Sequence, residues 1–191
     1  MVSLTSLIAP ISLTAQQAYL NSGRIILDSR VSAGMAAGMQ TDVSKTAVYD
    51  TKTPSSSSEI ADNRANAILN AVVYHVLEIA PGDLNGGAIA ATGAPISWLN
   101  AYNGCKSLTH NGNSDWRLPT ERELILMWIF KPAIEDLNGV LFASGENQYL
   151  SATEQSGSSV WSVRFSDGDV AYGSKSSPTS RYARCVREVT P

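Results

Sequence analysis

Residues 115–124 read Asp-Trp-Arg-Leu-Pro-Thr-Glu-Arg-Glu-Leu, and this stretch decides how we expect the chain to fold. Thr120 and Glu123 have the spacing of a capping box, in which a hydroxyl and a carboxylate satisfy the free amides of the first helical turn. Pro119 fits just outside the helix start, and Lys131-Pro132 is predicted to end the helix. The inward side of this helix is predicted to carry Leu124, Met127 and Trp128.

A second helix is predicted upstream of this stretch. Ser97 can cap it, and Trp98, Tyr102 and Cys105 then follow at about helical spacing. The loop between the two helices, Thr109–Ser114, is rich in Asn and Gly and is typical of a surface connection.

Short strands follow in the last third of the chain. Residues 160–166 alternate between apolar and polar side chains, which is the period of a half-buried strand. We expect Ser166–Asp169 to form a hairpin turn, with strands at 149–153, 170–172 and 182–188. The alternation predicts a buried face of Trp161, Val163 and Phe165 and a solvent face of Ser162, Arg164 and Ser166.

The N-terminal part is less clearly patterned. Residues 23–28 have the composition of a strand, 60–71 that of a helix and 72–79 that of a strand, while the Ser-rich segment 51–58 is predicted to be a loop. We therefore divide the chain into an N-terminal region, residues 1–87, and a domain at residues 88–191. The N-terminal region is either an elaboration of that domain or a small pilin-like β domain.

The composition excludes several classes of protein. The chain has 191 residues, of which 43% are hydrophobic and 16% charged, with a net charge of −3. The hydrophobic fraction can fill a core, the scattered basic residues argue against nucleic-acid binding, and no apolar run is long enough to span a membrane. The 25 Ser and 12 Thr residues favour an extracellular protein. Residues 1–10 lack the features of a signal peptide, so we take them as mature sequence.

Two cysteines, Cys105 and Cys185, stand 80 residues apart. Neither belongs to a Cys-x-x-Cys pair, so a zinc site is not expected. The residues alone allow two buried thiols or one disulfide.

The stretch at 115–124 resembles the Trp-Arg-Leu-Pro-Thr-x-x-Glu-Leu signature of a bacterial domain family with a C-type-lectin-like fold. Further matches follow in the expected order at 149–153, 160–168 and 182–187, so that the resemblance covers residues 88–190. It implies an α+β fold with two helices and a twisted antiparallel sheet. In that fold the first helix packs near the last strand, which implies a Cys105–Cys185 disulfide. The resemblance also gives structural roles to Trp116, Arg117, Leu118, Glu123 and Trp161.

The family implies binding by a surface and no catalysis. Its members include fimbrial or pilus-tip adhesins of gut Bacteroidales, and a related group is the variable proteins of diversity-generating retroelements. We expect an exported, cell-surface adhesin that binds a protein or glycan on a host or other cell, with pilus subunits as further partners. The alternatives are a retroelement-diversified variable protein, which a nearby reverse transcriptase gene would indicate, and a structural subunit of a fibre.

The expected ligand-binding residues lie on the solvent face of the strands and in the loops beside it. They are Glu154, Gln155, Ser158, Ser159, Ser162, Arg164, Ser166, Asp169, Tyr172, Ser174 and Arg181. Their Tyr, Ser and Arg side chains suit adaptable recognition surfaces.

Neither an enzyme nor a metal protein is expected. No nucleophile motif or phosphate-binding loop is present. His75 lies in an apolar run, and His110 lies in a loop where we expect it to be exposed. The carboxylates at 83–85 and 135–138 are interpreted as parts of turns, and the oxygen clusters that calcium-binding lectins need are missing. No cofactor, metal, nucleic acid or membrane insertion is therefore expected.

Overall fold

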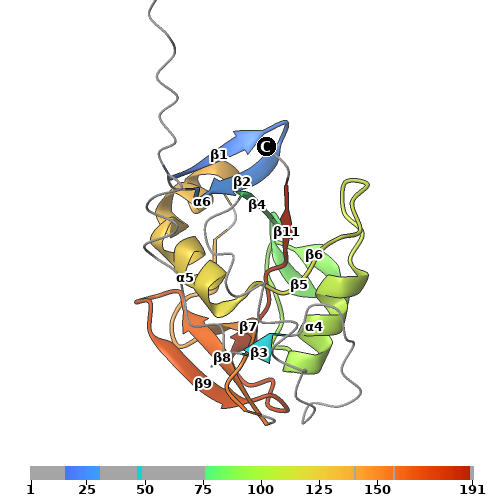
Figure 1. Cartoon of the computed structure of the whole chain (residues 1–191), viewed down its shortest axis with the longest axis vertical. Helices are drawn as coiled ribbons and strands as arrows, with labels where there is room; N and C mark the ends of the chain where they lie inside the picture. The colour runs from blue at the N-terminus through green and yellow to red at the C-terminus, as the bar shows by residue number, and fades with distance from the viewer. Residues whose placement is uncertain (1–15, 31–46, 49–75, 140, 157, 190–191) are drawn as a thin grey trace, which may run out of the picture.

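The computed structural model describes residues 16–30, 47–48, 76–139, 141–156 and 158–189 (Figure 1). The first sheet is antiparallel throughout, with strand order β1-β2-β4-β11. Its strands are β1 (Gln17–Asn21), β2 (Arg24–Asp28), β4 (Val76–Ile79) and β11 (Val186–Glu188). The strand predicted at 23–28 is thereby confirmed, and the sheet joins strands from both ends of the chain. The domain boundary at residues 87 and 88 stays a prediction.

The second sheet has the strand order β10-β7-β8-β9, with β3 paired to β7. Only β10 runs parallel to its neighbour. The bounds are β3 (Ala47–Val48), β7 (Gln148–Glu154), β8 (Ser159–Arg164), β9 (Val170–Ser174) and β10 (Arg181–Tyr182). A separate hairpin consists of β5 (Asp83–Asn85) and β6 (Ala88–Ala90).

Both predicted helices are confirmed, as α4 (Trp98–Ser107) and α5 (Glu121–Ile129). A further helix, α6 (Lys131–Asn138), follows at once. Lys131-Pro132 therefore starts a helix as well as following one, because proline lacks only an amide that the first helical turn leaves free. The turn interpretation was wrong for residues 135–138, which are helical, and for residues 83–85, which form β5.

The stretch that opens α5 connects the two sheets. Arg117 exchanges two backbone hydrogen bonds with Val186 of β11, at 2.8 and 2.9 Å. Two residues later, the carbonyl of Pro119 accepts from the amide of Ala152 in β7, at 2.7 Å. Trp116 and Leu118 point into the core beside these bonds. Residues 116–119 thus position both sheets relative to α5.

The core consists of two apolar clusters. One surrounds the disulfide and includes Trp98, Trp116 and Leu150. The other lies between α5, α6 and the sheets, and it includes Leu124, Met127 and Phe165. Trp128 is only half-buried at its edge and packs against Gly168 in the turn after β8. The described part of the chain is a mixed α+β fold with both clusters at its centre, and it contains no helix long and apolar enough to cross a membrane.

Several predicted segments differ from the structure or lie outside its described residues. The strand predicted at 182–188 is two short strands, β10 and β11, because the residues between them turn from one sheet toward the other. The predicted loop at 51–58, the helix at 60–71 and His75 lie outside the described residues.

Cys105 of α4 and Cys185 form a disulfide, with their Cα atoms 5.4 Å apart. Both residues are fully buried. The link ties α4 to the segment between the two sheets.

Reduction of this disulfide should destabilise the protein. Closing a loop of 80 residues is worth about 4 kcal/mol in the chain-entropy model, which corresponds to roughly 10 °C in Tm for a chain of this size. Scanning calorimetry with and without reductant measures the shift, and a Cys105→Ala/Cys185→Ala variant should not respond to reductant. An unchanged Tm in protein shown by alkylation to be reduced would contradict this role.

Candidate functional site

The frame of the candidate site is an ion pair at the start of α5. The guanidinium of Arg117 donates two hydrogen bonds of 2.7 Å to the two carboxylate oxygens of Glu123, which is fully buried. The same carboxylate accepts from the amide of Thr120 at 2.8 Å, and the Thr120 hydroxyl accepts from the Glu123 amide, so the predicted capping box is present. Burial, the largest single cause, lowers the pKa of Arg117, but the charges and hydrogen bonds of Glu123 and Glu188 together outweigh it, and the pKa is raised.

Beside this frame, the sheet of β7 to β10 has one side on α5. Its other side carries polar residues together with Leu150 and Val160, which are buried in the cluster around the disulfide. Val163 and Phe165 face α5 with Tyr149, as the alternation predicted. The register places Arg181 of β10 opposite Gln148 of β7, and Gln148 opposite Arg164 of β8. Directly opposite side chains share a side of the sheet. We call Gln148, Ser162, Arg164 and Arg181 the polar face.

Arg164 is neutralised by three carboxylates. Its guanidinium lies 2.6 Å from Glu146, 2.7 Å from Asp167 and 3.5 Å from Asp169. The hydrogen bonds from Arg164 lower the pKa of Asp167, and the same bonds raise the pKa of Arg164. Arg164 therefore fastens the β8–β9 turn to the loop before β7.

Two of the expected binding residues are buried, which corrects the prediction that they are exposed. Ser162 is fully buried, with its hydroxyl 2.9 Å from Gln148 Oε1 and 3.1 Å from the carbonyl of Ala171. Glu154 is buried in an ion pair with Lys175, whose ammonium lies 4.4 Å from the centre of the Trp98 ring. Alternation gives the side of a sheet on which a residue lies, but neighbouring side chains decide whether that side is open.

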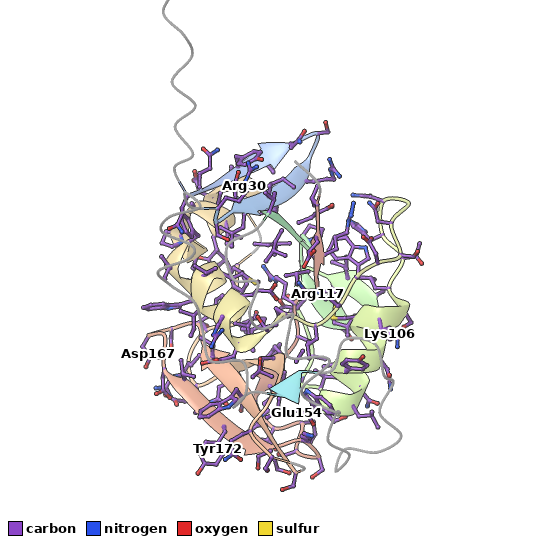
Figure 2. The ribbon with its side chains drawn as sticks, viewed as in Figure 1. Arg30, Lys106, Arg117, Glu154, Asp167 and Tyr172 are labelled. Atoms are coloured by element: carbon purple, nitrogen blue, oxygen red, sulfur yellow. A yellow bond between two sulfur atoms is a disulfide. The ribbon has the colours of Figure 1, made fainter. Side chains whose placement is uncertain are left out.

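Trp161 is only half-buried, so the prediction that it is a core residue was wrong. It lies on the same side as Val163, paired with Tyr172 of the edge strand β9, and the two ring centres are 5.5 Å apart. Tyr172 is 60% exposed. In Figure 2 its ring lies at the outer edge of the sheet.

The other expected residues are accessible, but on both sides of the sheet. Ser159, Tyr172 and Ser174 share the side of Trp161, whereas Arg164 and Arg181 belong to the polar face. The turns at the two ends of β8 carry the rest, all exposed: Gln155, Ser158, Ser166 and Asp169. We call these nine accessible residues the candidate surface.

Three residues that shape this region were missed in the sequence. Gln148 directly precedes the strand predicted at 149–153, so a strand drawn one residue longer would have included it. Lys175 gives no local signal, because its partner Glu154 lies 21 positions away. Glu146 likewise reaches Arg164 across 18 positions. His110, expected to be exposed, is half-buried against the Trp116 ring.

The arrangement consists of ion pairs, hydrogen bonds and exposed polar side chains. Among the described residues, no group of three or more His, Cys, Asp or Glu side chains could hold a metal ion. The centre of the carboxylate group at the β8–β9 turn is occupied by the Arg164 guanidinium.

Comparison with known proteins gives one family. The model of the Lcl C-terminal domain, a C-type-lectin-like family and not a known enzyme family, matches residues 77–187. The match begins within β4 and ends within β11, and it therefore includes the candidate surface and the disulfide. No curated protein matches the chain.

Glu123→Gln should destabilise the protein by about 3 kcal/mol, since it leaves the Arg117 charge without its buried partner and weakens the capping box. Glu121→Gln, two residues earlier in the same helical turn, is the matched control. Burial raises the pKa of Glu121, so removing its charge should cost nothing. Urea unfolding of both variants measures the difference, and equal costs would show that the ion pair does not stabilise the fold.

The burial of side chains in β8 and at Phe165, the residue that follows it, predicts an order of stability losses on substitution. Phe165→Ala should cost about 3–5 kcal/mol, because Phe165 is 1% exposed and stacks on Phe142 at 4.4 Å. Trp161→Ala should cost about half as much, and Ser162→Ala about 1 kcal/mol for its buried hydroxyl. Denaturant unfolding of the three variants measures the loss of free energy of unfolding in each and so gives their order. A Trp161→Ala cost equal to that of Phe165→Ala would restore the core assignment of Trp161.

Proposed function

The chain belongs to the family of Lcl C-terminal domains, and on this basis we propose that it is an exported, adhesin-type protein. Its C-type-lectin-like domain binds a protein or glycan ligand on another cell through the candidate surface. The observation that carries the proposal is that nine accessible polar and aromatic residues surround the β8–β9 hairpin. An ion pair at the exposed turn and a buried ion pair at the other end hold this hairpin in place.

The contacts of the hairpin support recognition by a rigid surface. Arg164 fastens one end through Asp167 and Glu146. Lys175 fastens the other end through Glu154 and a backbone bond of 2.9 Å to Ser158. A surface held in its binding conformation loses little entropy when a ligand binds. Serine and tyrosine at its rim provide adaptable hydrogen bonds and contact area.

The cell-surface location is supported by the disulfide. Such links persist in oxidising compartments and are rare in the cytosol. A position at the tip of a pilus is part of the proposal, as the family resemblance implies.

An array of glycans and host surface proteins, probed with the full chain, tests the proposed function. A Gln155→Ala/Tyr172→Ser variant changes two exposed candidate residues and should lower binding by at least about tenfold, as loss of an aromatic interface residue does. Lys106→Ser is the matched control, since Lys106 is exposed on α4, on the opposite side of the molecule from Tyr172 in Figure 2.

Loss of binding in the double variant alone would support the candidate surface. Equal binding by the double variant and the wild type would contradict it. A wild-type chain that binds nothing on the array would count against an adhesin.

A further inference from the structure

We propose that Arg181 is the anchor of the polar face for a protein partner, and that this partner presents an Asp or Glu carboxylate to it. The inference rests on the proposed function and names the chemistry of its ligand.

Arg181 is the cation of the polar face that has no acid. Its Nη1 donates one hydrogen bond, of 2.8 Å, to the carbonyl of Ser174. Among the residues that the structure describes, no carboxylate lies within ion-pair distance of its guanidinium. None of its nitrogens is buried without a partner, so the remaining N–H groups reach solvent.

The fold provides a place for this guanidinium. It lies against Gly173 of β9, where the side chain of any other residue would collide with Nη2. The guanidinium is thus supported from one side by the strand and fixed by the Ser174 carbonyl. Burial lowers the pKa of Arg181, which shows that part of its hydration is lost without a compensating charge.

Arg164, on the same face, is an arginine whose charge is compensated by carboxylates, and it serves as the comparison for Arg181. It has three carboxylates around it, at 2.6 to 3.5 Å. A carboxylate from a ligand would compensate the charge of Arg181 in the same way, because a guanidinium can donate two parallel hydrogen bonds to one carboxylate. Arginine is one of the residue types enriched among those that dominate the energy of protein interfaces.

The charges at the two ends of the β8–β9 hairpin, with Arg181 unneutralised at the Ser174 end and the Arg164 group at the turn, favour a protein over a polyanion. The carboxylates around Arg164 outnumber it, and Glu146 is 86% exposed at its side chain. A sulfated or other polyanionic chain would gain at Arg181 and be repelled at this group. A protein surface can offer an acid to Arg181 and a base to Glu146, so its charges can complement both.

Selection of random twelve-residue peptides displayed on phage, with the full chain as bait, tests the inference. The wild type should enrich peptides with Asp or Glu, and Arg181→Gln should lower the binding of the selected peptides at least tenfold. Arg181→Lys keeps the charge but loses the fork, so its loss should be intermediate. Arg30→Gln, which removes one positive charge beside the first sheet, should bind as the wild type does.

Four outcomes would overturn the inference. These are the absence of any selected peptide, selection without acidic residues, selected peptides that bind Arg181→Gln as well as the wild type, and Arg181-dependent binding of dextran sulfate in preference to the peptides. Melting curves of the Arg181 variants exclude unfolding as the cause of lost binding. Selection of neutral peptides, together with loss of array binding in the Gln155→Ala/Tyr172→Ser variant, would refute the carboxylate and leave the proposed function standing.

Discussion

The buried contact between Arg117 and Glu123 is the constraint on which the rest of this fold depends. One carboxylate accepts from the arginine that precedes the helix and from the amide that starts it. Since Arg117 is also bonded through its backbone to β11, and Pro119 to β7, the ion pair fixes α5 to both sheets. Glu123 is fully buried and the Arg117 side chain is 20% exposed. An ion pair with a buried partner gains little net energy, but the loss of either partner is costly. Its main effect is therefore to specify one arrangement.

Buried ion pairs that join distant segments occur at several further places in the molecule. Arg184 with Asp83, Arg187 with Glu78 and Lys175 with Glu154 are further buried pairs, and each joins segments distant in sequence. In the first of these, burial raises the pKa of Asp83 against the opposing effect of Arg184. A chain with only 16% charged residues thus uses several of its charges inside, while many of the candidate-surface residues carry hydroxyl groups. The result is a rigid frame under a surface of small polar groups.

On this frame the candidate surface has two different sides. The polar face carries a neutralised and an unneutralised arginine, and the other side carries the Trp161–Tyr172 pair at an edge strand. Since β9 is the last strand of its sheet, both sides are within reach of one large ligand. A ligand bound as proposed would contact the hairpin itself, so its shape is what the ion pairs at its two ends maintain.

The sequence by itself determined the elements whose signals are local. The capping box of Thr120 and Glu123, the alternation around Val163 and the turn at Ser166–Asp169 each depend on neighbours a few positions away, and each is present in the structure. Tertiary structure alone decided the burial of Ser162 and Glu154 and the partial exposure of Trp161. It also selected the disulfide over two free thiols and left Arg181 without an acid. The physical reason is that alternation fixes only the direction of a side chain, whereas burial and charge pairing depend on what the rest of the chain brings opposite it.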